Sequence, residues 1–336
     1  MTVSRVLRNE RYVTEDKRLA VQAAIEALGY VPLQSARNLA SSVARAIGLL
    51  VPNETADLSN KTGYEYLSAL HLGALGVCME RNYALLLLRG PKPRALADEL
   101  VGLVRNRQIG GCVIPAPATE IPGLLKTLKQ REVPFAAISP LRLEHVPRWT
   151  AADERPVVQA MTRRLIEFGH RQIAFAGGSV SRAGVERLAG FTDAMTAAGI
   201  AVDKRHVGTV GFGFDDGLRA GRALLTGARR PTAIVCANDD VAAGVLAVAH
   251  EKQMTMPDEL SVVGFDNSGL SRKTWPALTT VDLPVAEMAA QAVRQVISLL
   301  ETGGEPVEPT ALFPCVPCFR DSVAAAPATA RARVAG

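Results

Sequence analysis

Polar side chains follow three of the predicted strands, at places where a ligand could be held by hydrogen bonds. They form the pairs Asn53 and Glu54, Asn238 and Asp239, and Asp266 and Asn267. Ligands of open α/β sheets bind at the carboxyl ends of the strands, where amide and carboxylate groups make several hydrogen bonds at once. Each pair has a structural alternative, because Asn and Asp just after a strand often cap the next helix, and we expect Asp239 to be such a cap. The convergence of the pairs from two parts of the chain favours a binding site.

Motifs of catalysis and metal binding are incomplete in this sequence. The run 177–181 begins like a G-x-S-x-G nucleophile elbow but lacks the last glycine, and 211–213 lacks the third glycine of a dinucleotide fingerprint. The five histidines are scattered without metal-ligand spacing, and we expect His170 to be structural. Cys315 and Cys318 have C-x-x-C spacing, but no second pair lies nearby to complete a zinc site. We therefore predict neither an enzyme nor a bound metal or cofactor.

The composition indicates an ordinary globular protein. The chain has 336 residues, 48% hydrophobic and 21% charged, which suits roughly two domains. No apolar run reaches the ~18 to 20 residues that cross a bilayer, and the N-terminus has no apolar stretch of signal-peptide type. Five cysteines are an odd number, so we predict no disulfide framework. We expect a cytoplasmic protein that does not enter a membrane.

Short apolar runs alternate with helical patterns from Ala46 onward, which predicts parallel sheets covered by helices. The first series has strands at 47–51, 83–88, 112–114 and 135–138. A break at 141–150 separates it from a second series at 173–176, 207–210, 233–236 and 261–265. Helices are predicted at 67–78, 95–107, 124–128, 156–168, 184–198, 215–226, 240–253 and 285–300, and a last strand at 312–319. Two α/β lobes of similar build place a ligand cleft between them.

The N-terminal segment is basic. Residues 1–46 carry seven Arg and Lys against four Asp and Glu, a net +3 of the +5 for the whole chain. A helix is predicted over 14–28, where acidic residues follow a Thr cap and Gly29 fits the end. Residues 2–7 are predicted to form a shorter helix with Ser4 and Arg5 outward, which suits contact with the DNA major groove. A basic head is typical of nucleic-acid binding, although a solvated basic helix has the same charge.

Several runs of the chain resemble, in order, the motifs of the lactose-repressor (LacI/GalR) family of transcription regulators. Thr2-Val-Ser-Arg-Val-Leu7 is similar to the family's recognition helix, Ala24 to Pro32 to the end of its third headpiece helix, and Ala36 to Ala40 to its hinge helix. The matches continue through 47–52, 165–170, 186–191, 231–235, 237–239, 260–266, 276–281 and 320–322. The resemblance therefore covers nearly the whole chain.

The resemblance implies an α/β fold: a two-lobed, periplasmic-binding-protein-like (type I) core with parallel sheets, preceded by a helix-turn-helix head. It divides the chain into 1–29 (partial head), 30–45 (hinge), 46–152 with 284–309 (N-terminal lobe), 153–283 with 310–322 (C-terminal lobe) and 323–336 (disordered tail). The first helix and turn of such a head would lie upstream of Met1. Either Met1 is an internal methionine taken as the start, which we favour, or the chain is a sugar sensor that does not bind DNA.

The resemblance assigns six residues to DNA contact: Thr2, Ser4, Arg5, Tyr12, Arg37 and Leu39. The first three would face the major groove, and Tyr12 the DNA backbone or a neighbouring base. Leu39 would be the wedge that two hinge helices insert into the minor groove, with Arg37 in or near that groove. Alternatively, Leu39 packs the linker on the core.

The resemblance also assigns residues to an effector between the lobes: Arg187, Asp266, Asn238, Phe212, Asn53, Tyr64 and Asp153. Arg187 and Asp266 would hydrogen-bond effector hydroxyls with the support of Asn238, because a carboxylate or guanidinium can span two adjacent hydroxyls of a sugar. Phe212 would stack on a sugar face or belong to the ordinary core. The remaining residues would add contacts from the other lobe and the crossover.

The predicted function is therefore a homodimeric repressor that binds palindromic operator DNA and responds to a small-molecule effector, a sugar. A solute-binding protein for transport or chemotaxis is a rival, but it would need a signal peptide where this chain has a basic head and hinge. The sign of the effector's action is not predicted, because an inducer and a corepressor would use the same pocket.

Overall fold

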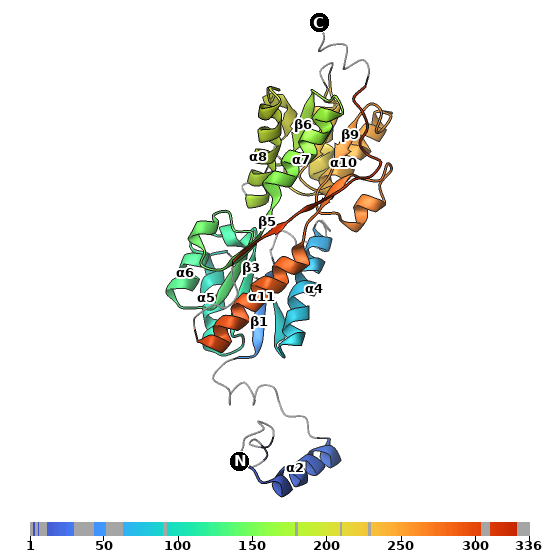
Figure 1. Cartoon of the computed structure of the whole chain (residues 1–336). Coiled ribbons are helices and arrows are strands. Elements are labelled where there is room, and N and C mark those ends of the chain that lie inside the picture. The colour runs from blue at the N-terminus through green and yellow to red at the C-terminus, as the bar shows by residue number, and fades with distance from the viewer. Residues whose placement is uncertain are drawn as a thin grey trace. The chain divides into compact units, whose positions relative to one another are not determined.

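The computed structural model describes residues 3, 6, 12–29, 44–51, 63–89, 93–178, 181–208, 210–227, 230–303 and 310–327 (Figure 1). The chain divides into two units, Met1–Ala44 and Arg45–Gly336. The first unit contains helix α2, Glu15–Leu28, with two acidic residues in its first turn. The chain leaves α2 through Gly29 in the left-handed conformation (φ 55°), and the Gly29 N–H donates to the carbonyl of Glu26 (3.3 Å). The helix predicted over 14–28 is confirmed.

The first sheet of the second unit has six parallel strands in the order β11-β5-β4-β3-β1-β2. They are β1 (Ala46–Val51), β2 (Ala84–Arg89), β3 (Gly111–Pro115), β4 (Phe135–Ile138), β5 (Trp149–Asp153) and β11 (Ala311–Pro314). The central strands β3 and β4 are buried along their whole length. Their sequences are continuously apolar because helices cover both faces of the sheet.

Two pairs of helices cover this first sheet. Helices α4 (Tyr64–Glu80) and α11 (Val285–Thr302) lie side by side on one face, and α5 (Pro93–Arg105) and α6 (Leu124–Gln130) cover the other. Short 3₁₀ turns, η1 (Ala118–Glu120) and η2 (Leu143–His145), complete the lobe. The backbones of α4 and α11 approach so closely that a Cβ at Gly73 would overlap the backbone of Ala286. A residue without a side chain is therefore required at this crossing.

The second sheet has four parallel strands in the order β7-β6-β8-β9. They are β6 (Ile173–Ala176), β7 (Val207–Gly208), β8 (Ala233–Cys236) and β9 (Ser261–Val263). Helices α7 (Glu154–Glu167) and α8 (Arg182–Ala197) cover one face, and α9 (Phe214–Leu224) and α10 (Asp239–Glu251) the other. Two 3₁₀ turns, η3 (Lys204–His206) and η4 (Gly269–Arg272), lie in the connections.

Three stretches of chain link the two sheets. The first runs from β5 into α7, and the second from β10 (Thr280–Asp282) into α11. The third runs from β11 into β12 (Val316–Cys318), which pairs with β10 in a small antiparallel ribbon. Figure 1 shows this last connection as the long red segment between the lobes. Residues next to these three links therefore lie at the junction of the two lobes.

The predicted alternation of strands and helices is confirmed in the described residues, with ends that differ by a few residues. The expected break at 141–150 is confirmed up to Arg148, but the sequence pattern missed strand β5, which starts at Trp149. A buried Thr in this strand hid the pattern: Thr150 is fully buried, and its hydroxyl donates to the carbonyl of Met288 (3.1 Å). The strand expected at 312–319 is two strands in different sheets, β11 and β12, separated at Cys315.

The C-terminal segment also departs from expectation. Residues 310–322 are predicted to belong to the second lobe, whereas β11 pairs with β5 at the edge of the first sheet. Residues 323–336 are predicted to be disordered, but 323–327 packs against the second lobe: the Ala326 N–H donates to the carbonyl of Phe168 (2.9 Å), and the His170 ring contacts the carbonyl of Ala324 (Nε2 to O, 3.0 Å). Backbone hydrogen bonds that the composition does not reveal hold this part in place. Residues 328–336 lie outside the described residues.

Candidate functional site

Two charged side chains of the second lobe form a buried ion pair at the junction of the lobes. Glu154 is the first residue of α7, directly after β5, and Arg187 lies on the second turn of α8. The Ser181 hydroxyl caps α8 by accepting from the N–H of Gly184 (3.3 Å). The distance from Arg187 Nη2 to Glu154 Oε1 is 2.8 Å, and Arg187 and Glu154 are only 3% and 5% exposed.

The Arg187 guanidinium has further partners. Its Nη1 donates to the carbonyl of Ala237, its Nη2 lies 3.6 Å from Asp266 Oδ1, and its central carbon stands 3.6 Å from the centre of the Phe265 ring. Burial opposes the charge of Arg187, but the carboxylates of Glu154 and Asp266 hold its pKa above the ordinary value. Its Nε is buried and has no hydrogen-bond partner among the described residues. That N–H is available to an acceptor atom of a ligand.

Asp266 is the third charged group of this cluster. Burial raises its pKa to about 8, and three nearby carboxylates (Asp239, Glu154 and Asp240) act in the same direction against the single guanidinium. Its backbone is left-handed (φ 101°), and so is that of the next residue, Asn267 (φ 49°). The Asn267 side chain donates to Asp282 Oδ1 (2.8 Å) and accepts from Arg320 (2.5 Å). These bonds fix the turn that carries Asp266.

Asn238 is the cap of α10, so the expectation that Asp239 caps the helix is wrong. The Asn238 side chain accepts from the N–H of Val241 (3.0 Å) and donates to the carbonyl of Phe212 (2.9 Å). Asp239 is inside the helix and buried, where it accepts from the hydroxyl of Thr280 (2.6 Å) and from the N–H and hydroxyl of Ser268 (2.7 and 2.9 Å). Burial raises the pKa of Asp239 to about 6 against these hydrogen bonds. Through its hydrogen bonds with Ser268 and Thr280, Asp239 connects the turn after Asp266 to strand β10.

The first lobe contributes Tyr66 from the first turn of α4. Burial raises the pKa of its phenol above the ordinary range, and the carboxylates of Asp266 and Glu154 add to the effect. The neighbouring Glu65 accepts from the N–H of Gly269, a second contact between the lobes. Tyr66 and Glu154 were not predicted from the sequence. The signal for Tyr66 was its place in the first turn of the helix that follows β1, next to the predicted Tyr64.

The structure brings together only some of the predicted effector residues. Arg187 and Asp266 meet, and Asn238 holds the loop of Phe212, which is half-buried. Tyr64 is 38% exposed, and Asp153 is exposed at the end of β5. Asp153 is close enough to help raise the pKa of the Cys315 thiol to about 12, chiefly a burial effect, so this thiol is uncharged near neutral pH. Asn53 lies outside the described residues.

The predicted DNA-contact residues fall almost entirely outside the described part of the chain. Only Tyr12 is described, and it is 95% exposed. Thr2, Ser4, Arg5, Arg37 and Leu39 lie outside the described residues. The structure therefore offers no geometry for these five.

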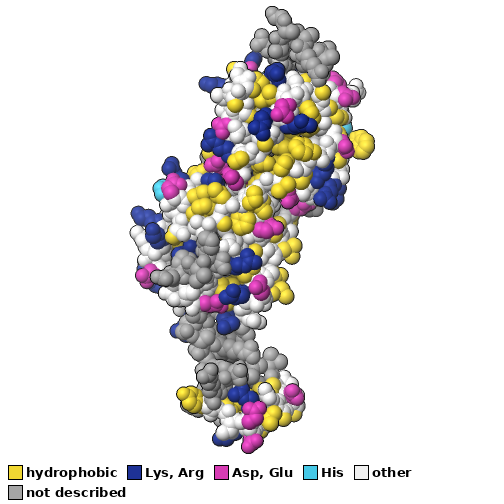
Figure 2. All heavy atoms as spheres, in the orientation of Figure 1, with side chains coloured by type: hydrophobic (Ala, Val, Ile, Leu, Met, Phe, Trp, Pro, Cys, Tyr) yellow, Lys and Arg dark blue, Asp and Glu magenta, His cyan; other side chains and the backbone are white. Residues whose placement is uncertain are grey.

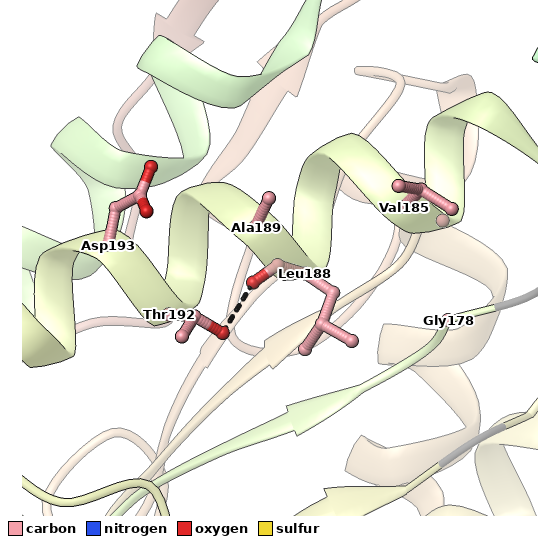
Figure 3. A pocket seen from close by; sticks show the side chains of 7 residues that line it. Gly178, Val185, Leu188, Ala189, Thr192 and Asp193 are labelled. Carbon is pink, nitrogen blue, oxygen red and sulfur yellow. Dashed lines mark hydrogen bonds between the residues drawn. The ribbon is translucent and has the colours of Figure 1, made fainter. Parts of the chain in front are cut away.

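A hollow of about 400 Å³ lies beside α8, and none of its lining residues belongs to the charged cluster. Figure 3 shows its lining: Gly178, Gly184, Val185, Leu188, Ala189, Thr192 and Asp193. Its two polar side chains have partners within the protein, since the Thr192 hydroxyl donates to the carbonyl of Leu188 (2.8 Å) and Asp193 accepts from Arg155 (2.7 Å). We therefore place the candidate site at the Arg187 cluster.

The described residues contain no group of three His, Cys, Asp or Glu side chains that could hold a metal ion. Within the same residues, no helix is both long and apolar enough to cross a membrane. The cluster around Arg187 consists of charged side chains that also form hydrogen bonds, with the uncharged thiol of Cys315 nearby. Its chemistry is that of binding a polar small molecule.

Comparison with known proteins gives matches over both parts of the chain. Residues 1–33 match the model of bacterial regulatory proteins of the lacI family, and residues 162–323 match a periplasmic binding protein-like domain. The HTH-type transcriptional regulator GalR of Escherichia coli (strain K12) is 32% identical over 89% of this chain and 85% of its own length. The HTH-type transcriptional regulator CelR of Thermobifida fusca is 31% identical, with 93% and 90% covered.

Solved structures agree with these matches. A transcriptional regulator CelR–cellobiose complex is 26% identical and superposes with a TM-score of 0.74 over 95% of this chain and 94% of its own. The lac repressor dimer bound to operator and the anti-inducer ONPF, at 22% identity, shares the fold with a TM-score of 0.80 over 96% and 95%. The predicted fold class, a type I periplasmic-binding-protein-like core with parallel sheets, is confirmed.

Proposed function

Because the chain belongs to the lacI family of bacterial regulatory proteins, we propose that it is a sequence-specific DNA-binding repressor controlled by a sugar. The observation that carries this function is that one chain joins a match to the lacI-family regulator model (residues 1–33) to a periplasmic-binding-like domain. The first match favours a regulator over a sugar sensor that does not bind DNA. The relatives are regulators, so we assign no catalytic role. Its action on DNA places it in the cytoplasm.

The DNA contacts come from the first unit. Thr2, Ser4 and Arg5 read the major groove, since Arg pairs with guanine and hydroxyls reach phosphates or base edges. The full exposure of Tyr12 suits a contact with the DNA backbone. Leu39 enters the minor groove as a wedge with Arg37 beside it.

The effector binds where Arg187, Asp266 and Tyr66 converge from the two lobes. The unpartnered Nε of Arg187 and the Asp266 carboxyl offer a donor and an acceptor to adjacent hydroxyls. The cellobiose complex of CelR supports a sugar as the ligand class. Asn238 sets the position of Phe212, which stacks on the sugar face, while Asn53, Tyr64 and Asp153 add contacts at the rim.

The working form is a homodimer. Leu72, Leu75 and Met79 form an exposed apolar stripe on α4, and Trp275 is 83% exposed on the second lobe. Figure 2 shows hydrophobic side chains at the surface over α4. Exposed apolar side chains at i, i+3 and i+7 of one helix mark an association surface. The dimer of the lac repressor supports this state, and a two-fold dimer reads a palindromic operator.

Control of DNA binding follows from the position of the effector between the lobes. A ligand that binds one relative orientation of the lobes better than the other shifts the population of that orientation. The dimer surface spans both lobes, so the shift reaches the DNA-binding units through it. A bias of ~1 to 3 kcal/mol changes DNA affinity about 5- to 150-fold.

The test is selection of bound sequences from a random DNA duplex pool with the protein at its native length, isolated from its source cells. We expect enrichment of one palindrome and a dissociation constant in the nanomolar range, about 10⁻⁸ to 10⁻¹¹ M at physiological salt. Fluorescence anisotropy with that duplex then measures the effect of cellobiose, ribose and other sugars. Selection that enriches no sequence would refute the function, and Arg5→Ala is the control that weakens the selected contact.

A further inference from the structure

We propose that Glu154 is a built-in counter-anion of Arg187 and restricts the effector to a polyol that carries no phosphate or carboxylate. The inference rests on the proposed function, because it specifies the ligand class of the same site. An anionic group of the ligand would compete with the Glu154 carboxylate for the Arg187 guanidinium.

The charge of Arg187 is already matched within the protein. Its Nη2 contacts Glu154 at 2.8 Å and Asp266 at 3.6 Å, and its Nη1 is used by the carbonyl of Ala237. An anionic ligand would have to displace Glu154 from Nη2. Glu154 is 5% exposed at the start of α7, so displacement would leave it buried without its counter-charge. Removing one partner of a buried pair is strongly unfavourable.

The charge balance around the pair also disfavours an anionic ligand. Asp266 is surrounded by the carboxylates of Asp239, Glu154 and Asp240 and by one guanidinium. On the side of the first lobe, Glu65 lies close to Asp240, and at the crossover Asp153 lies close to the Cys315 thiol. Even with Asp266 protonated, the described residues of the junction carry more acidic groups than guanidinium groups: Glu154, Asp239, Asp240, Glu65 and Asp153 against Arg187 and Arg320. A phosphate or carboxylate brought here is repelled at short range and with little screening by water.

The cluster still offers unsatisfied hydrogen-bonding groups to a ligand. The buried Nε of Arg187 lacks an acceptor, and Asp266 is reached only at 3.6 Å by the guanidinium. A hydroxyl group can accept from the first and donate to the second, and a protonated amine can also donate to Asp266. An anionic group can accept from Nε but meets the Glu154 carboxylate that is bound to the same guanidinium. Uncharged hydroxyls, with or without an amine, are therefore the matching chemistry.

The test uses the full chain and compares Glu154→Gln with the wild type. The amide keeps the shape of the side chain and removes its charge, so Arg187 gains capacity for an anion. With inorganic phosphate and glucose 6-phosphate as probes, we expect calorimetry and thermal unfolding to give at least tenfold tighter binding to Glu154→Gln than to the wild type. Glu167→Gln is the matched control, because Glu167 lies on the same helix but pairs with Arg164 at the surface (3.5 Å). It should bind no better than the wild type.

Two results would overturn the inference. One is equal binding of phosphate to the wild type and Glu154→Gln; the other is a wild type that binds glucose 6-phosphate more tightly than glucose. The second comparison needs no variant, so it holds even if Glu154→Gln does not fold. Adding Arg187→Ala to Glu154→Gln should remove the gain in anion binding. DNA selection is independent of these measurements, so a failure of the proposed function is recognised separately.

Discussion

Arg187 and Glu154 form an ion pair at 2.8 Å in which both residues are more than nine-tenths buried. The pair joins the first turn of α7 to the second turn of α8, and it stands next to Asp266 and Tyr66. Desolvation of two charges costs free energy that their attraction only partly offsets, so such a pair is a weak source of stability. Its presence at the junction of two lobes is better explained by what it does to a ligand.

Arg187→Ala is expected to abolish the effector response and leave operator binding intact. It removes the donor of the site and leaves Glu154 buried without a partner, which should lower the free energy of unfolding by about 3–5 kcal/mol. Urea denaturation measures the stability, and anisotropy with the selected duplex measures DNA binding with and without effector.

The double variant Arg187→Ala/Glu154→Gln is the control for this loss of stability. It removes the unpaired charge, so it should regain a large part of the lost free energy. Loss of operator binding in the folded single variant would contradict the assignment of Arg187 to the effector site.

Gly73→Ala is expected to destabilise the first lobe. A Cβ at this position meets the backbone of Ala286 where α4 crosses α11, and backbone atoms cannot move aside as a side chain can. Overpacking of this kind costs about 1–3 kcal/mol. Gly102→Ala in α5 is the matched control: nothing lies within 4 Å of the added methyl group, and Ala is favoured over Gly in a helix by about 1 kcal/mol. Equal unfolding free energies of the two variants would contradict the close crossing.

Periodicity predicted most of the fold because both sheets are parallel and covered on both faces. Strands such as β6 and β8 are then continuous apolar runs that can be recognised directly. Strand β5 was hidden because its buried Thr150 is satisfied by a carbonyl of α11, a contact between residues far apart in the sequence. The division of 312–319 into β11 and β12 depends on which strand each segment pairs with, and an apolar run carries no such information.

Only part of the candidate site could be predicted from the sequence. Arg187 and Asp266 could be assigned by resemblance to family motifs, whereas Glu154 looks like an ordinary acid in the first turn of a helix. Its burial arises only from the packing of α7 against α8. Asn238 and Asp239 are both suitable caps, and the sequence cannot choose between neighbours. Thr280 of β10 and Ser268 decide the choice, because both hydrogen-bond to the Asp239 carboxylate from distant parts of the sequence.

Leu72→Glu is expected to turn the dimer into a monomer and to weaken operator binding. Leu72 is 68% exposed on the apolar stripe of α4, so a carboxylate there costs little in an isolated chain but is desolvated in an interface. Sedimentation velocity measures the association state. Val185→Glu places the same charge on another exposed apolar position, on α8, and should leave the dimer unchanged. A dimer that survives Leu72→Glu at the same concentration would exclude this stripe as the interface.

Asp266→Asn should change how stability depends on pH. Burial raises the pKa of Asp266 from the ordinary 3.8 to about 8, so between these values the folded chain holds a proton that the unfolded chain has released. The stability contributed by this group is complete below pH 3.8 and is lost as pH rises toward 8. One such proton gives a slope of about −1.4 kcal/mol per pH unit. Asn cannot titrate and tolerates the left-handed backbone of this position (φ 101°), so the variant should lack this slope and gain stability at pH 8.

Denaturation of the wild type and Asp266→Asn at intervals from pH 5 to pH 8 measures this difference in slope. Asp239, with a pKa raised to about 6, remains in both proteins and accounts for any slope they share below that pH. Asp193→Asn is the control with the opposite sign, because its hydrogen bond to Arg155 lowers the pKa of Asp193, so its contribution is lost only as pH falls below the ordinary value of a carboxyl. That variant should therefore keep the wild-type slope from pH 5 to pH 8. If Asp266→Asn also kept the wild-type slope, Asp266 would be ionised beside Arg187 throughout this pH range. The junction would then carry one more negative charge at pH 5 than the raised pKa of Asp266 implies.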